Sequence, residues 1–190
     1  FIPNTAYYEN YLQKHNIKRY KLRGEVFGDV CEFYEQIYET GNRLVYRTKS
    51  DYYDWLNRLD QFSTNIYNFL EINKEGLENG YTQPKLVTRG VVAQIDAIIN
   101  SDIESNPYLK VFLEADESLL TPIEKKDLIN KAKNLINNKI NPAYKELNNF
   151  LKNDYLVNSR DSIGIKDIPD GKIYYEELAK YYTTTDLTPD

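Results

Sequence analysis

The chain has 190 residues, of which 41% are hydrophobic and 14% aromatic, enough for one domain with a hydrophobic core. Its 24 basic and 29 acidic residues are interspersed and leave a formal net charge of -5, which argues against a nucleic-acid-binding surface. A single histidine and a single cysteine exclude an internal disulfide and a cysteine-based metal knuckle, and no apolar run is long enough to span a membrane.

Two amphipathic helices are predicted near the start of the chain. Asn4 and Thr5 can cap a short helix that ends near His15, and a longer helix with apolar residues at three-and-four spacing is predicted over residues 25–40. We assign His15 no metal role, because a zinc site built on one histidine would need carboxylates for all its other ligands. Cys31 lies within the apolar pattern and is interpreted as a buried thiol.

Two further helices are predicted before residue 100. Ser50 or Asp51 is expected to cap the first, whose apolar stripe runs from Trp55 to Leu77. The second begins with Pro84 in its first turn and carries a stripe of Val87, Val91, Ile95 and Ile98. Gly90 interrupts this second helix, and we interpret it as a position where a neighbouring helix comes close.

The most strongly patterned stretch runs from Thr121 to Tyr155. Thr121, Pro122 and Glu124 have the spacing of a capping box with proline at the first helical position. An apolar face follows, in which Leu135 and Leu147 are expected to be core residues; unbroken, such a helix would be about 50 Å long. Pro142 predicts a kink, or two helices that meet at Asn141-Pro142.

The C-terminal third is less regular. Residues 156–171 read as a long loop that ends in a Pro169-Asp170-Gly171 turn, and either a functional loop or a simple connection fits it. A last helix is predicted over residues 173–182. Thr188 and Pro189 then repeat the cap-then-proline start, from which we expect the sequence to be the N-terminal part of a longer chain.

No stretch alternates with period two for long enough to predict a strand. The expected fold is therefore all-α, an irregular array of about six to eight amphipathic helices around one long kinked helix (Thr121 to Tyr155), with little or no sheet. Residues 1–190 are expected to form a single domain, with a subdivision into 1–80 and 81–190 left open. The 18 tyrosines indicate either a surface that stacks on sugar or peptide, or amphipathic side chains between helices.

The residue types point to three candidate substrate-binding residues: Arg160, Tyr174 and Tyr175. Arg160 lies in the irregular stretch and offers a planar fork of donors that suits a carboxylate. Consecutive helical positions point to different faces, so only one of the two tyrosines can be core. The alternative is that Arg160 pairs with Asp154 or Asp161 and both tyrosines pack internally. No catalytic or metal-binding residue is predicted.

Several short motifs, weak singly, resemble in combination the bacterial family called domain of unknown function 885. The likeness covers residues 51–190 well and the first fifty residues loosely. The marks are Gly80-Tyr81-Thr82-Gln83-Pro84, Val92-Ala93-Gln94-Ile95-Asp96, Asn106-Pro107-Tyr108, Asn141-Pro142-Ala143-Tyr144, Asp154-Tyr155-Leu156, Arg160, Gly164, Pro169-Asp170-Gly171, Tyr174-Tyr175 and Thr183-Thr184-Thr185-Asp186-Leu187-Thr188-Pro189.

The resemblance implies a zinc-dependent, peptidase-like hydrolase whose HExxH-type or HExxP-type helix motif lies downstream of these marks. No residue here matches that motif, so the chain would be a helical scaffold and one wall of a substrate cleft, inactive alone. Its partners would be the C-terminal half of the same chain and a peptide, with zinc only in the full-length protein. The alternative is a self-contained, tyrosine-rich module that binds peptide or glycan, or a protein-interaction scaffold. Localisation stays open between the bacterial cytoplasm and export, as a periplasmic protein or lipoprotein, after loss of a signal segment.

Overall fold

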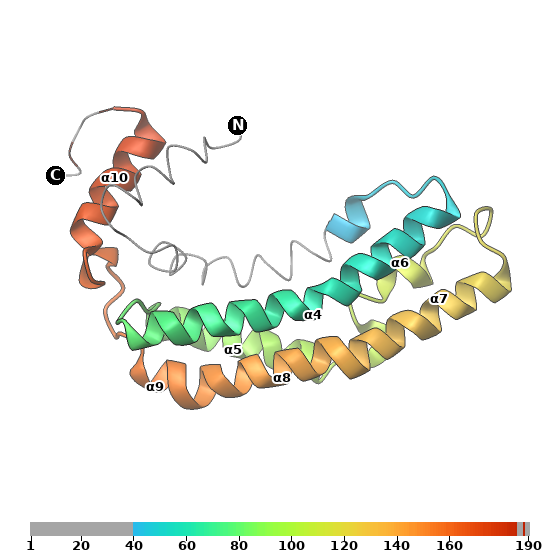
Figure 1. The fold of residues 1–190 in the computed structure, drawn as a ribbon, viewed down its shortest axis with the longest axis horizontal. Coiled ribbons are helices and arrows are strands. Elements are labelled where there is room, and N and C mark those ends of the chain that lie inside the picture. The colour runs from blue at the N-terminus through green and yellow to red at the C-terminus, as the bar shows by residue number, and fades with distance from the viewer. Residues whose placement is uncertain (1–39, 186–187, 189–190) are drawn as a thin grey trace.

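The computed structural model describes residues 40–185 and Thr188, apart from the side chains of Glu177, Leu178 and Tyr181. In this part of the chain the regular structure is helical and no strand is formed (Figure 1). The predicted all-α class is therefore confirmed. The two helices predicted before residue 40, with His15 and Cys31, lie outside the described residues.

The first long helix is α4 (Lys49–Glu78). Its N-cap is Thr48, two residues before Ser50 and three before Asp51, the two predicted caps. Asp51 instead occupies the third helical position, where its carboxylate accepts the Thr48 backbone N–H at 2.8 Å and closes a capping box. The prediction was therefore wrong about the N-cap residue. Asp51 does take part in the capping box, but as its third helical residue.

Helix α4 ends in a turn that reverses the chain into α5 (Lys85–Ile99). Gly80 has a φ of 78°, a left-handed conformation that favours glycine. The Tyr81 N–H bonds back to the Gly76 carbonyl at 2.8 Å and so satisfies one carbonyl at the helix end. Pro84 is the N-cap of α5, one position before its predicted place.

Gly90 lies on the exposed side of α5. No heavy atom lies within 4 Å of the position that a Cβ would take, so the predicted close approach of another helix is wrong. We expect Gly90→Ala to raise the free energy of unfolding by about 1 kcal/mol, because alanine loses less backbone entropy in a helix. Thermal unfolding followed by circular dichroism should show a higher melting temperature; an unchanged or lower one would mean that the methyl group clashes.

A loop with two short helices connects α5 to the next long element. These are η2 (Ile103–Ser105) and α6 (Lys110–Leu113). Asn106 supports the loop, since its side-chain oxygen accepts the Tyr108 backbone N–H at 3.1 Å. This bond places the Tyr108 ring in the core.

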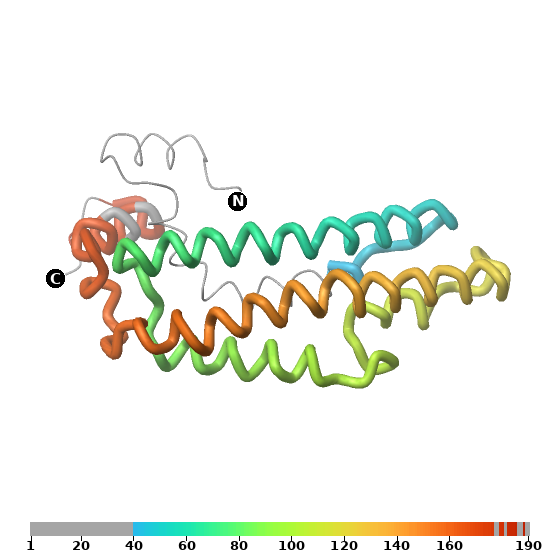
Figure 2. Tube along the Cα trace, turned by 60° about the horizontal axis from the view of Figure 1, so that its bottom comes forward, coloured from blue at the N-terminus to red at the C-terminus, as the bar shows by residue number. Residues whose placement is uncertain are grey.

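The long helix predicted from Thr121 runs without a break over the 37 residues from Pro122 to Asn158. Along it, α-helical turns alternate with wider π turns. Figures 1 and 2 show it crossing the whole molecule beside α4. Its segments are α7 (Pro122–Leu135), the π turn η3 (Ile136–Ile140), α8 (Asn141–Phe150), the π turn η4 (Leu151–Tyr155) and α9 (Leu156–Asn158).

The interruption predicted at Pro142 takes the form of a π turn. In η3 the Asn141 N–H bonds to the Ile136 carbonyl, five residues back instead of four. Pro142 has no N–H to donate, and its ring would press on the Asn138 carbonyl in a regular helix. Widening the turn directly before the proline relieves both problems while the helix continues.

The predicted capping box at the start of α7 is confirmed. Glu124 Oε2 accepts the Thr121 N–H at 2.9 Å, and the Glu124 N–H donates to Thr121 Oγ1 at 3.3 Å. Lys49 Nζ on α4 adds an ion pair to Glu124 Oε1 at 2.6 Å. Lys49, followed by the Thr121 bonds, lowers the pKa of Glu124 to about 2.

This lowered pKa predicts a pH dependence at the α7 start. A carboxylate with a depressed pKa in the folded state stabilises the fold above its ordinary pKa of 4.5, and this contribution is lost as the pH falls toward 2. Carboxyl-carbon NMR should show Glu124 titrating near pH 2, and Lys49→Ala should raise that midpoint. A Glu124 midpoint near 4.5 in the unaltered chain would contradict the arrangement.

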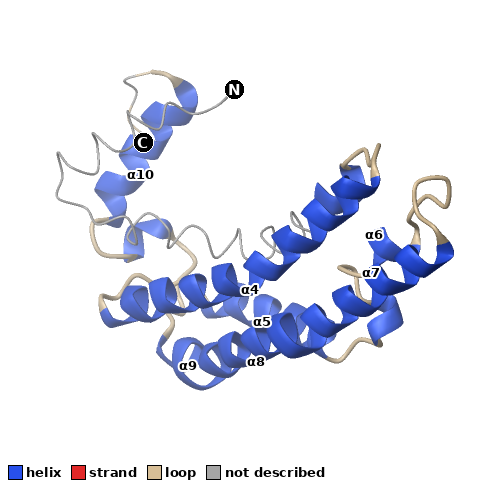
Figure 3. Ribbon diagram, turned by 45° about the vertical axis from the view of Figure 1, so that its right-hand side comes forward, coloured by secondary structure: helices blue, strands red, loops and turns tan. Residues whose placement is uncertain are grey.

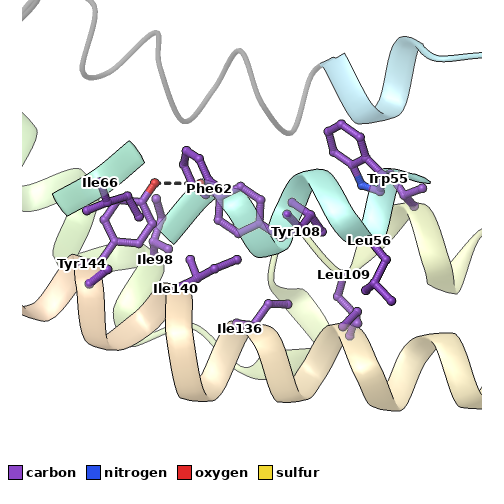
Figure 4. Packing of buried hydrophobic residues seen from close by; sticks show 14 of the residues in the cluster. Trp55, Leu56, Phe62, Ile66, Ile98, Tyr108, Leu109, Ile136, Ile140 and Tyr144 are labelled. Atoms are coloured by element: carbon purple, nitrogen blue, oxygen red, sulfur yellow. Dashed lines mark hydrogen bonds between the residues drawn. The ribbon is translucent and has the colours of Figure 1, made fainter. Parts of the chain in front are cut away.

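The core lies between α4, α5 and the long helix (Figure 4). At its centre the Phe62 ring lies 5.5 Å from the Tyr108 ring and 6.1 Å from the Tyr144 ring, measured between centroids. The two tyrosine hydroxyls bond to each other at 2.8 Å, so neither polar group is buried without a partner. This cluster joins three segments that are far apart in the sequence.

Of the two leucines expected to be core, one is confirmed. Leu147 is 1% exposed, whereas Leu135 is only partly buried. Leu135 falls short because its side chain borders a surface groove between α4 and α7.

Several tyrosines are buried among the helices. Tyr52 shows the pattern, since its hydroxyl accepts the Asp116 N–H at 3.0 Å and so ties α4 to the loop after α6. The amphipathic ring thus packs against apolar neighbours while its hydroxyl bonds to another segment. The same use accounts for five of the buried tyrosines, Tyr52, Tyr81, Tyr108, Tyr144 and Tyr155.

Candidate functional site

The predicted residue Arg160 lies where the long helix ends and the chain meets the start of α5. Its backbone forms an isolated parallel bridge with Pro84. The Lys85 N–H donates to the Arg160 carbonyl at 2.9 Å, and the Arg160 N–H donates to Thr82 Oγ1 at 3.2 Å. The main chain of Arg160 thereby pins residues 82–85 to the end of the long helix.

The guanidinium of Arg160 binds backbone carbonyls. Nε donates to the Thr82 carbonyl at 2.9 Å, while Nη1 donates to the carbonyls of Ser162, at 2.8 Å, and Gly164. Burial lowers the pKa of this guanidinium, and the nearby Asp167 opposes the shift. These charge-assisted bonds fold the chain after Arg160 into a tight loop.

The expected carboxylate partners of Arg160 are not used. Asp161 pairs with Lys85 instead, with Nζ and Oδ2 3.0 Å apart, and no ion pair joins Asp154 to Arg160 within the described residues. The alternative predicted from the sequence gave Arg160 a partner within the chain, as the structure does. It expected a carboxylate, whereas the partners are backbone carbonyls.

Tyr155 completes this cluster from the last turn of the π segment η4. Its hydroxyl accepts the Gln83 N–H at 2.9 Å, and burial raises the pKa of Tyr155 to about 12. A tyrosine with this pKa stays neutral at physiological pH and acts here as a hydrogen-bonding group. We call Thr82, Gln83, Tyr155 and Arg160 the joint.

Beyond the joint the chain forms η5 (Ile165–Asp167) and α10 (Gly171–Thr183), which lies off the end of the other helices (Figure 2). Helix α10 packs on η5. Gly171 permits this contact, because a Cβ there would lie 2.1 Å from the Ile165 carbonyl oxygen. The Tyr81 hydroxyl donates to Asp170 Oδ2 at 3.4 Å and links α10 back to the end of α4.

The paired tyrosines of α10 divide as helical geometry requires. Tyr174 is 5% exposed, and its hydroxyl has no hydrogen-bond partner in the described part of the chain. Tyr175 is 49% exposed and turns its ring to the outside. No hydrogen bond or ring contact described in the structure joins either tyrosine to Arg160. The three predicted residues therefore border the same connection without forming one site.

A comparison with known families now places the chain. The sequence model of a bacterial protein of unknown function, DUF885, matches residues 5–190. The chain belongs to the DUF885 family.

One solved structure similar to this DUF885 chain is described as "the crystal structure of the putative lipoprotein from Colwellia psychrerythraea". The two share 23% sequence identity with a TM-score of 0.72, which shows a common fold. The match covers 78% of this chain and 26% of the other, so the DUF885 chain spans about a quarter of that protein. A search of curated proteins gave no match.

The joint of this DUF885 chain includes three residues that were not proposed as site residues, Thr82, Gln83 and Tyr155. All three belong to the motifs that carry the family resemblance, which was the available signal. Their roles depend on contacts across 72 and 78 positions of sequence, from Gln83 to Tyr155 and from Thr82 to Arg160. Local periodicity carries no information about such contacts.

A metal centre does not fit the part of this DUF885 chain that the structure describes. No group of three or more histidine, cysteine, aspartate or glutamate side chains lies close enough there to hold an ion. In the same residues no helix is both long and apolar enough to cross a membrane.

Proposed function

We propose that this DUF885 chain is the N-terminal helical scaffold, and one wall of the substrate cleft, of a longer metal-dependent peptidase-like protein. The observation that carries the proposal is the joint, in which Arg160 binds three backbone carbonyls and fixes the direction in which the chain leaves the helices. A wall must hold its shape while substrate binds, and bonds to a charged donor are among the stronger ways to hold a loop.

The length of the solved relative supports a larger assembly, because the match spans only 26% of that chain. In the proposal the remaining residues of the longer protein form the other wall of the cleft and supply the zinc. The described residues hold no cluster of three or more potential metal ligands. In the proposal their part is to bind and orient a peptide and to support the cleft.

The three residues predicted to bind substrate receive different parts in this proposal. Tyr175 is the exposed ring and presents its hydroxyl to the peptide. Tyr174 holds α10 in place from its buried position. Arg160 is a positioning residue, because its guanidinium is already bonded within its own loop.

The test uses the longer natural protein with zinc and a fluorogenic peptide. Tyr175→Phe should lower kcat/KM about tenfold at an unchanged melting temperature, the effect of one lost hydrogen bond in the transition state. Tyr67→Phe is the matched control, since Tyr67 is an exposed tyrosine on α4. Equal activities for both variants, or no peptide hydrolysis by the unaltered protein, would overturn the proposal.

A further inference from the structure

A groove lies on the surface between α4 and α7, which run next to each other (Figure 3). Its volume is about 470 Å³, within the range of sites that hold small ligands. Leu56 and Leu135 supply the apolar part of its lining. At about 1.5 Å per residue, Leu56 lies roughly 30 Å along α4 from the joint, so the groove is a separate site.

Three carboxamides border the groove: Asn57 from α4, and Asn130 and Asn134 from α7. All three are exposed, and none has a side-chain hydrogen bond to another residue in the described part of the chain. A carboxamide offers both a donor and an acceptor, the same pair that a peptide group presents. The rim can therefore bond to N–H and C=O groups of a ligand.

The two charged residues of the lining are already neutralised. Asp60 pairs with Lys139, and Lys131 Nζ lies 2.7 Å from Asp127 Oδ2 and 5.6 Å from the centre of the Tyr53 ring. Neither charged group of the lining is therefore left without a partner of opposite charge. The remaining hydrogen-bonding capacity of the rim is neutral, and it complements an uncharged ligand.

An extended polypeptide fits these features better than a sugar does. Its backbone repeats the donors and acceptors that the three carboxamides can bond, and alternate side chains point to the same side. One apolar side chain can then lie on the two leucines. No aromatic ring is among the lining residues, whereas protein sites for sugars usually offer a ring for stacking.

We propose that the α4–α7 groove binds an extended, uncharged stretch of polypeptide. Asn57, Asn130 and Asn134 bond to its backbone, and Leu56 with Leu135 receives one apolar side chain. Binding at this groove does not depend on the hydrolysis proposed above and is measurable on the 190-residue chain.

The probe is an acetylated and amidated heptapeptide of alternating threonine and leucine, titrated into the isotope-labelled chain and followed by amide NMR. Shift changes should centre on Asn57, Asn130 and Asn134. Asn134→Ala and Asn130→Ala should each weaken binding about fivefold, the loss of one hydrogen bond. Asn68→Ala is the matched control, because Asn68 lies on the same face of α4 eleven residues further along and does not line the groove.

Three outcomes would overturn the inference. The first is no binding of the heptapeptide at concentrations of about 10 mM, weaker than any useful affinity for such a site. The second is equal affinity of the Asn134→Ala, Asn130→Ala and Asn68→Ala variants. The third is shifts at the groove with tri-N-acetylchitotriose and none with the peptide, which would make the groove a glycan site.

Discussion

Phe62→Ala is expected to lower the free energy of unfolding by about 3–5 kcal/mol, the usual cost of removing a buried aromatic side chain. Phe62 is fully buried between the rings of Tyr108 and Tyr144. Those rings are held in place by the bond between their hydroxyls, so they cannot move freely into the space. The variant therefore loses both the transfer free energy of the ring and the contacts across the cavity.

Urea unfolding followed by circular dichroism measures this effect, with Tyr67→Ala as the control on the same helix. Tyr67 is 38% exposed, and its removal should cost far less than that of Phe62. A difference below about 1 kcal/mol between the two variants would show that the centre of the core has been misplaced.

Leu147→Ala is expected to cost about 2–5 kcal/mol, and Leu135→Ala about 1 kcal/mol. Leu147 lies on α8 and is buried in the hydrophobic core, while the side chain of Leu135 is partly open to the α4–α7 groove. Truncating Leu135 widens a space that water already reaches, so the cavity term is largely absent. Equal losses in chemical denaturation would mean that the groove is closed in solution.

The start of α7 could be predicted from the sequence because its determinants are local. Thr121 and Glu124 lie three residues apart and satisfy each other's backbone groups wherever the helix packs. The position of the interruption at Pro142 was predictable for the same reason. Its form as a π turn was not, since the neighbouring core decides whether a helix breaks or widens.

The errors at Gly90 and Leu135 have a different cause. A three-and-four pattern shows which face of a helix is apolar, and it does not show how far the partner helix extends along that face. Gly90 faces solvent and Leu135 faces a groove for that reason. The joint was likewise beyond local prediction, because Thr82 and Arg160 meet only after α5 and the long helix have packed.

The joint gives Arg160 a mechanical role in this DUF885 chain. Its carbonyl contacts close the loop that leads to α10, and its main chain fixes that loop to residues 82–85. The Lys85–Asp161 ion pair and the Tyr81–Asp170 hydrogen bond also join the segment before α10 to the turn between α4 and α5 and to the start of α5. Losing the guanidinium should therefore loosen α10 and leave the main core intact.

Hydrogen exchange measured by mass spectrometry on the Arg160→Met variant tests this account most directly, with Arg89→Met, an exposed arginine of α5, as the control. Methionine keeps the apolar length of the side chain and removes all its donors. We predict that amides in residues 162–183 exchange at least about tenfold faster in Arg160→Met, with no change in α4 or α8 and no change anywhere in Arg89→Met. Unchanged protection of α10 in Arg160→Met, or equal loss of protection in α4 and α8, would contradict the role assigned to the joint.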